Sequence, residues 1–297
     1  MTMMRTDFDR WARSQLDQVE CALDRWVPGD APAALGQAMR YGVLDGGKRL
    51  RPLLVLAAAQ AVEGAEEAAL RAAVAVELIH AYSLVHDDMP CMDNDVLRRG
   101  KPTVHVRYGE AQAMLAGDAM QALAFEVLTP AQGVAPALQA RLCSLLARAA
   151  GHAGMAGGQA IDLASIGLPL DEHTLRDMHH RKTGALLQAS VLMGASCGRS
   201  DPRAWAALEA YGAAVGLAFQ VVDDILDVTQ PSATLGKTAG KDSCSNKPTY
   251  VSVLGLAAAQ AHAGELRDQA HAALGRSGLE RAAWLSLLAD MVVERDS

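Results

Sequence analysis

Two long apolar runs, each ending in a cluster of aspartates, restrict the possible folds of this chain more than any other feature. VELIHAYSLVH leads into the first cluster and GAAVGLAFQVV into the second. Both runs consist mainly of helix formers, so each cluster should stand at the C-terminal end of a helix, where the helix dipole disfavours negative charge. Crowded carboxylates also resist ionising together. A bound divalent cation would remove both penalties, and its candidate ligands are the aspartates of the two clusters, Asp87, Asp88 and Asp93 in the first and Asp223, Asp224 and Asp227 in the second.

Composition favours a helical protein. Alanine and leucine dominate the 297 residues, 51% are hydrophobic and only 4% are aromatic. β-Branched clusters are scarce, and the apolar residues recur with helical rather than alternating spacing. No Pro/Gly/Ser-rich linker interrupts the chain. We therefore predict one all-α domain over residues 1–297.

Charge and cysteine usage exclude several functional classes. The net charge is −7 with scattered basic residues, which argues against a nucleic-acid-binding surface. The five cysteines lie far apart without a CxxC pair, which predicts a reduced cytoplasmic protein without structural zinc. The N-terminus lacks the apolar segment of a signal peptide. The longest uncharged stretch, 183–198, is shorter than a membrane span, so no stable membrane insertion is expected.

Helical spacing predicts how the second cluster is presented. Residues i and i+4 lie on one face of a helix, so Asp223 and Asp227 should point the same way. Gln220 and Gly216 lie on the same stripe, one and two turns earlier. We expect the missing side chain of Gly216 to leave open space below a metal site.

The first cluster needs a break in its helix. Asp87 and Asp93 are six residues apart, and a straight helix would splay them. Pro90 lies between them, and a proline that interrupts the helix could bring Asp93 back toward Asp87. The helix turns before Asp87 carry His80, Ser83 and the bulky Tyr82.

The clusters suit magnesium better than zinc. A single DDxxD motif is as often a solvated helix end as a metal site. Two clusters after two apolar runs favour the metal site. Magnesium prefers hard oxygen ligands, keeps several waters and usually shares substrate phosphates, so a diphosphate with a hydrocarbon tail is the expected substrate class.

Basic residues stand where they could bind that diphosphate. GGKRLRP precedes a proline that can start a helix, and helix N-termini with flanking arginines bind anions. Other basic residues directly follow the clusters or lie in glycine-rich turns. Each taken alone is more often an exposed surface charge. The candidate anion-binding residues are Lys48, Arg51, Arg98, Arg99, Lys182, Thr183, Lys237 and Lys247.

The segment GGQAIDL has two interpretations. Gln159 and Asp162 could form a polar network near the site. Alternatively, the glycines could serve only close helix packing. The sequence favours neither.

The chain resembles the trans-isoprenyl diphosphate synthases, most closely the bacterial farnesyl diphosphate synthase type. The matching segments are GGKRLRP, ELIHAYSLVHDDMPCMDNDVLRRGKPTVH, AGGQAIDL, HRKTGALL, GLAFQVVDDILD, and LGKTAGKD with the later NKPTY. They occur in family order across nearly the whole chain. The resemblance implies a bundle of mostly antiparallel helices around a deep central cavity, in a homodimer, with about three magnesium ions bridging an allylic diphosphate.

The resemblance also implies a role for each matched residue. Magnesium would be held by Asp87 and Asp93 with Asp88 in support, and by Asp223 and Asp227 from the opposite wall. Phe219 would border the reacting carbons. The allylic diphosphate would be bound by Arg98, Lys182, Thr183, Gln220, Lys237 and Lys247, and isopentenyl diphosphate by Lys48, Arg51, His80 and Arg99.

Product length and class are further expectations. Tyr82 and Ser83 are the expected chain-length residues, with Tyr82 as part of the floor that stops the growing chain. Tyr82, five residues before Asp87, resembles the farnesyl type, whereas plant geranylgeranyl synthases share DDxxxxD but tend to have Met there. The acidic tail VVERDS replaces the basic ending of many relatives. The alternatives are a geranylgeranyl diphosphate synthase, a terpene cyclase and a non-catalytic prenyltransferase subunit. The basic residues for a second diphosphate argue against a cyclase, and the retention of both clusters argues against a subunit.

Overall fold

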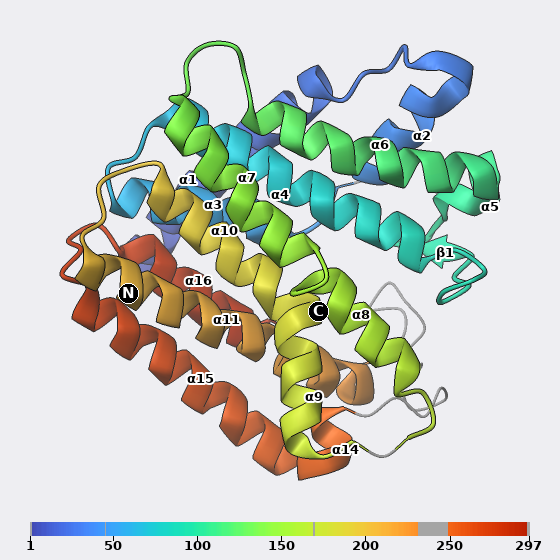
Figure 1. Cartoon of the computed structure of the whole chain (residues 1–297). Helices are drawn as coiled ribbons and strands as arrows, with labels where there is room; N and C mark the ends of the chain where they lie inside the picture. Colours follow the sequence, from blue (N-terminus) through green and yellow to red (C-terminus); the bar gives the residue numbers. More distant parts are fainter. Residues whose placement is uncertain (1, 45, 169, 231–248, 296–297) are drawn as a thin grey trace.

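The computed structural model describes residues 2–44, 46–168, 170–230 and 249–295 and is almost entirely helical (Figure 1). The two strands, β1 (Leu97–Arg98) and β2 (Lys101–Pro102), form a short antiparallel hairpin that the sequence did not predict. The first half contains α1 (Thr2–Trp26), η1 (Pro32–Ala34), α2 (Leu35–Val43), α3 (Leu50–Ala61), α4 (Glu66–Asp87), α5 (Val104–Tyr108) and α6 (Glu110–Leu128). The second half contains α7 (Pro136–Ala150), α8 (Met155–Ala164), α9 (Glu172–His179), η2 (His180–Gly184), α10 (Ala185–Ser196), α11 (Pro202–Thr229), α14 (Tyr250–Leu254), α15 (Leu256–Ser277) and α16 (Ala283–Glu294).

The core lies between layers of helices with roughly aligned axes (Figure 1). α3 and α10 are apolar on nearly all sides and are buried between α4 and α11. α6 covers α4, and α15 covers α11 on the other side. The two helices that carry the aspartate clusters are therefore central, and the predicted all-α fold is confirmed.

Local signals explain where the central helices begin. Asp201 caps α11: its Oδ1 accepts a 2.7 Å hydrogen bond from the Ala204 backbone N–H, and Pro202 occupies the first turn. The helical segment from Glu172 to Ser196 is divided, because η2 is a π-helical turn between α9 and α10. Such turns often mark functional sites, and this one contains Lys182 and Thr183.

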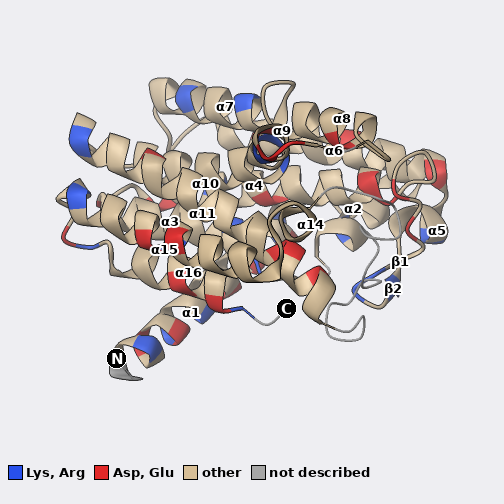
Figure 2. Cartoon of the chain, turned by 90° about the horizontal axis from the view of Figure 1, so that it is seen from below, with Lys and Arg blue, Asp and Glu red and all other residues tan. Residues whose placement is uncertain are grey.

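Two observations bear on membranes and charged partners. α4 and α11 are long and apolar enough to span a membrane, but 67% and 61% of their apolar windows are buried within the bundle. Burial of this extent is what core helices of a folded domain show. Lys and Arg are scattered along the described helices, without a continuous basic stripe in the view of Figure 2.

Candidate active site

A cavity of about 450 Å³ lies between the ends of α4 and α11 and the segments α8 and η2. Carboxylates of both clusters lie on its wall, and so do apolar and basic side chains. Its lining includes Tyr82, Ser83, Asp87, Asp93, Arg98, Gln159, Asp162, Lys182, Thr183, Phe219, Gln220, Asp223 and Asp227, with Arg51 and His80. The structure thus brings most of the predicted site residues to one cavity.

The chain doubles back after α4 and returns Asp93 to the cavity. The helix ends at Asp87, and the Asp93 backbone N–H donates a 2.8 Å hydrogen bond to the Asp87 carbonyl. Asn94 has a φ of +51°, a left-handed conformation that asparagine tolerates better than most residues. The prediction that the break near Pro90 brings Asp93 back toward Asp87 is confirmed.

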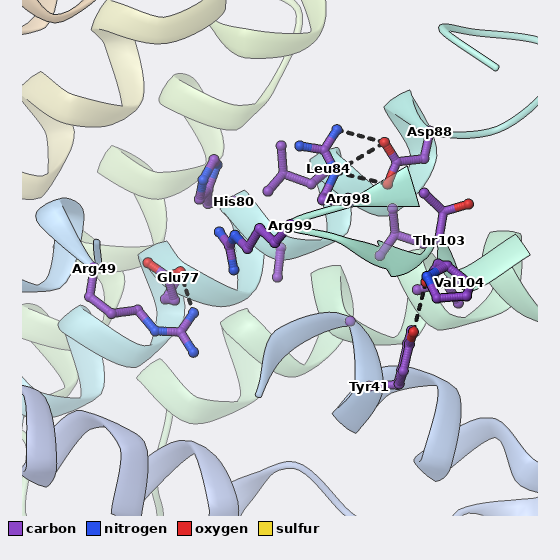
Figure 3. Close-up of a pocket in the computed structure, with 14 residues that line it drawn as sticks. Tyr41, Arg49, Glu77, His80, Leu84, Asp88, Arg98, Arg99, Thr103 and Val104 are labelled. Carbon is purple, nitrogen blue, oxygen red and sulfur yellow. Dashed lines mark hydrogen bonds and ion pairs between the residues drawn. The ribbon is translucent and has the colours of Figure 1, made fainter. Parts of the chain in front are cut away.

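Asp88 faces away from this cavity. Its side chain is almost fully buried and accepts two charge-assisted hydrogen bonds from Arg98, with Nε at 2.9 Å from Oδ2 and Nη2 at 2.6 Å from Oδ1 (Figure 3). Asp88 lines a separate pocket of about 30 Å³ on the other side of Arg98. Its support of the metal site, expected from the resemblance, would therefore act through Arg98.

Burial makes ionisation of Asp87 less favourable than that of an exposed aspartate. Burial raises the pKa of Asp87 to about 6, the nearby Lys182 opposes this rise, and Asp93 adds to it. A divalent cation would relieve the penalty because it stabilises the ionised carboxylates. In the described part of the chain no three His, Cys, Asp or Glu side chains converge on one point. This donor set fits magnesium, which keeps waters and shares substrate phosphates rather than requiring a closed protein cage.

The second cluster separates its two adjacent aspartates. Asp223 and Asp227 line the cavity from successive turns of α11, as the helical spacing predicted. Asp224 also borders the cavity but is 2% exposed and holds a hydrogen-bond chain together. Its Oδ1 accepts from the Gln220 amide at 2.8 Å, and its Oδ2 accepts from the Tyr250 backbone N–H at 2.8 Å.

The expectation of open space at Gly216 is wrong. A Cβ at this position would lie 2.9 Å from the Cα of Gly184, in the π-helical turn. Gly216 therefore permits close contact between α11 and η2. That contact places Thr183 beside Gln220, whose Oε1 accepts a 2.9 Å hydrogen bond from the Thr183 hydroxyl.

Lys182 is held by the GGQAIDL segment. Its Nζ donates a 2.6 Å hydrogen bond to Oδ2 of Asp162, which is buried. A Cβ on Gly158 would lie 2.2 Å from the Lys182 backbone nitrogen. Asp162 thus supplies the predicted polar contact and Gly158 a close approach, whereas the buried Gln159 amide lines the cavity without a hydrogen-bond partner among the described residues.

Arg51 and His80 form the basic part of the cavity wall. Arg51 is 9% exposed and its buried Nε has no hydrogen-bond partner, while burial lowers its pKa to about 10. Burial and then the neighbouring arginines, Arg51 and Arg99 foremost, lower the pKa of His80 well below 6.5, so its imidazole is neutral near pH 7. Figure 3 shows His80 near Arg99, whose Nη1 donates to the Gly46 carbonyl. Neutral His80 can donate one hydrogen bond to an anion without adding charge.

The remaining predicted basic residues do not line the cavity or lie outside the described residues. Lys48 is exposed and lines neither this cavity nor the smaller pocket. Its neighbour Arg49, not predicted as a site residue, is buried and pairs with Glu20 at 2.7 Å and with Glu77 at 2.6 Å. Lys237 and Lys247 lie outside the described residues.

The comparisons identify the family. A model of the polyprenyl synthetase family matches residues 32–281. The chain belongs to this family. It is 44% identical to the Arabidopsis thaliana protein named heterodimeric geranylgeranyl pyrophosphate synthase large subunit 1, chloroplastic, over 98% of this chain and 80% of that protein.

Solved structures agree with this assignment. An FPP/GFPP synthase from Zymomonas mobilis is 41% identical with a TM-score of 0.84, over 98% of this chain and 99% of that one. A geranyltransferase from Helicobacter pylori, complexed with magnesium and isoprenyl diphosphate, is 34% identical with a TM-score of 0.86, over 96% and 97%. This polyprenyl synthetase is therefore a prenyltransferase with the predicted isoprenoid synthase type of fold.

On the wall of the polyprenyl synthetase cavity, the chain-length candidate Tyr82 projects from α4 and contacts Gln121 of α6. Tyr82 is 9% exposed, and its hydroxyl accepts a long 3.4 Å hydrogen bond from the Gln121 amide. The His86 ring lies edge-on to the Tyr82 ring at 5.7 Å. Ser83 also lines the cavity, with its hydroxyl donating to the His80 carbonyl at 2.9 Å. Tyr82 is thus the larger obstacle to a growing hydrocarbon.

One residue that contacts the cavity wall from behind was not predicted. Arg295 follows α16, and its Nη2 donates a 2.7 Å hydrogen bond to the Phe219 carbonyl and lies 3.4 Å from Oδ1 of Asp223. The acidic tail gave no sign of this arginine, because the net charge of a segment does not show which of its side chains points toward the interior.

Proposed function

We propose that this prenyltransferase condenses isopentenyl diphosphate with dimethylallyl or geranyl diphosphate to give farnesyl diphosphate. The observation that carries the proposal is the single cavity that holds carboxylates from both clusters, two sets of basic residues and an apolar end closed by Tyr82. Geranylgeranyl diphosphate is the second candidate product, favoured by the name of the Arabidopsis thaliana relative.

Magnesium fits this donor set. Asp87, Asp93, Asp223 and Asp227 would hold the ions, about three in number by resemblance, and they would supply electrostatic and Lewis-acid neutralisation of the departing diphosphate. Only oxygen ligands are needed, and both clusters provide them from facing helices.

The chain's own residues bind and orient the two substrates. Arg98, Lys182, Thr183 and Gln220 bind the allylic diphosphate and accept the negative charge that develops on it. Arg51, His80 and Arg99 bind isopentenyl diphosphate, and Phe219 borders the reacting carbons. Holding the double bond beside the allylic carbon makes carbon–carbon bond formation effectively intramolecular. The apolar wall excludes water, which would trap the cation as an alcohol, and the released diphosphate takes the proton.

Two properties of the whole protein accompany the proposal. A cytoplasmic location is supported by Cys21, Cys91, Cys143 and Cys197, which are all free thiols. A homodimer is supported by the large apolar side chains that α5 and α6 expose, among them Val106, Met114 and Leu115.

An assay of the purified protein with labelled isopentenyl diphosphate and each allylic diphosphate tests the proposal. Magnesium-dependent farnesyl diphosphate, abolished by a chelator, is the expected product. Longer products would keep the enzyme class and favour the geranylgeranyl alternative. No consumption of isopentenyl diphosphate would reject the synthase and leave the cyclase and the non-catalytic subunit, which product analysis and addition of a catalytic partner would separate.

A further inference from the structure

Arg295 stands behind the cavity wall and is anchored at three points. Its guanidinium lies over the Phe219 ring at 3.9 Å from the ring centre, bonds to the Phe219 carbonyl and reaches Asp223 at 3.4 Å. The side chain is only 9% exposed. A charge buried to this extent normally requires a partner of opposite sign, and Asp223 is that partner.

The helix that carries Arg295 is itself fixed. Trp284 at its start stacks on Trp11 at 5.6 Å, in a cluster that includes Phe8. Further along α16, Asp290 accepts a 2.7 Å contact from His271 of α15. These contacts determine where α16 ends, so the place of Arg295 beside α11 follows from packing of the whole C-terminal pair of helices.

The pairing of Arg295 is incomplete. Its Nε is buried and has no hydrogen-bond partner. A buried donor without a hydrogen-bond partner is destabilising. At 3.4 Å the contact with Asp223 is also longer than a strong charge-assisted hydrogen bond. The arginine therefore compensates the charge of Asp223 but restrains its carboxylate less strongly than the hydrogen bonds from Arg98 restrain Asp88.

Asp223 belongs to the predicted metal site, and a guanidinium beside it opposes a second cation. Repulsion between like charges is strong where water is partly excluded. A magnesium ion that arrives with a diphosphate brings compensating negative charge, whereas a magnesium ion alone does not.

We propose that Arg295 is a resident counter-ion of Asp223, which keeps the second acidic cluster from binding magnesium until a diphosphate arrives. The inference rests on the proposed function, because it assigns Asp223 to the metal site. Arg295 is thus a positioning residue that sets the order in which metal and substrate load. It acts through its charge, since removal of that charge would weaken the repulsion that a metal ion without diphosphate meets at Asp223.

Binding of Mn²⁺ to the substrate-free protein, measured by electron paramagnetic resonance, tests this role. The parent is Asp87→Asn/Asp93→Asn, which leaves the second cluster as the remaining site. Arg295→Met removes the charge and keeps the length, whereas Arg295→Lys keeps the charge. Arg5→Met is the matched control, because Arg5 pairs with Glu294 beside Arg295 but contacts no site residue. Circular dichroism confirms that each variant is folded.

We expect Arg295→Met to bind Mn²⁺ about tenfold more tightly than the parent, and both Arg295→Lys and Arg5→Met to stay within about twofold. Adding Asp223→Asn to Arg295→Met should abolish the gain. Equal or weaker binding by Arg295→Met, including no detectable binding in either protein, would overturn the proposal, as would equal tightening by Arg295→Lys. None of these measurements needs turnover, so a wild type that consumes no isopentenyl diphosphate would reject the proposed function separately.

Discussion

Arg98 donates hydrogen bonds to Asp88 from two of its nitrogens, Nε and Nη2. The carboxylate next to Asp87 therefore orients an arginine instead of facing the cavity. The same arginine lines the cavity on its other side. Two adjacent aspartates therefore differ in placement: Asp87 lines the cavity, and Asp88 fixes the direction of a basic side chain that also lines it.

Replacing Asp88 with Asn should raise the KM for the allylic diphosphate about tenfold with a smaller change in kcat. Asn offers one acceptor oxygen instead of two and no charge, so Arg98 loses its orientation but keeps its own charge. Steady-state kinetics with each substrate varied in turn measures the effect. The KM for isopentenyl diphosphate is the internal control, and an equal rise in both values would contradict the assignment.

The neighbours Asp223 and Asp224 should respond differently to the same substitution. Asp223→Asn should lower kcat at least a hundredfold because its side chain lines the cavity, and it should lower Tm less than Asp224→Asn does because it is 38% exposed and its contact with Arg295 is long, at 3.4 Å. Asp224→Asn should lower Tm by several degrees, because a buried acceptor for Gln220 and the Tyr250 N–H is weakened. Thermal unfolding and steady-state kinetics of both variants measure these effects. A stability loss confined to Asp223→Asn would reverse the assignment.

Much of this site could be predicted from spacing alone. The pairing of Asp223 with Asp227 follows from helical periodicity, and the return of Asp93 follows from the break that Pro90 imposes. These are local properties, carried by residues within one or two turns. The distant segments could be assigned to one site because their motifs occur in the order that the family shares.

What could not be predicted depends on contacts between distant segments. Nothing in the letters DD distinguishes Asp88 from Asp87, since the difference is made by Arg98 in the hairpin. Gly216 was expected to open space, but the π-helical turn occupies it through Gly184. Arg295 is placed by packing of α16 on α1 and α15, which no short pattern encodes.

The stability of the metal-free protein should depend on pH through Asp87. Its folded pKa of about 6 exceeds the ordinary 3.8, so its contribution to stability is complete below pH 4 and is lost as pH rises through 6. At pH 7.5, Asp87→Asn should therefore be more stable than the wild type by about 3 kcal/mol, a difference that vanishes near pH 4.

Urea unfolding in chelator at several pH values checks this expectation. Millimolar magnesium should then stabilise the wild type and leave Asp87→Asn nearly unchanged, since the variant lacks a predicted ligand. Equal free energies of unfolding for the wild type and the variant at pH 7.5 in chelator would show that burial does not raise the pKa of Asp87.

Replacing Tyr82 with Ala should lengthen the products by at least one isoprene unit, because the ring closes the apolar end of the cavity between α4 and α6. Tyr82→Phe should leave product length unchanged, since it keeps the ring and loses only the long contact with Gln121. Ser83→Ala is the matched control on the neighbouring position, where the hydroxyl donates within its own helix. Chromatographic sizing of labelled products measures all three.

If Tyr82→Ala gives the wild-type product, the obstacle lies elsewhere in the cavity and the assignment of Tyr82 fails. If Tyr82→Phe also lengthens the product, the hydroxyl and Gln121 rather than the ring hold the floor closed.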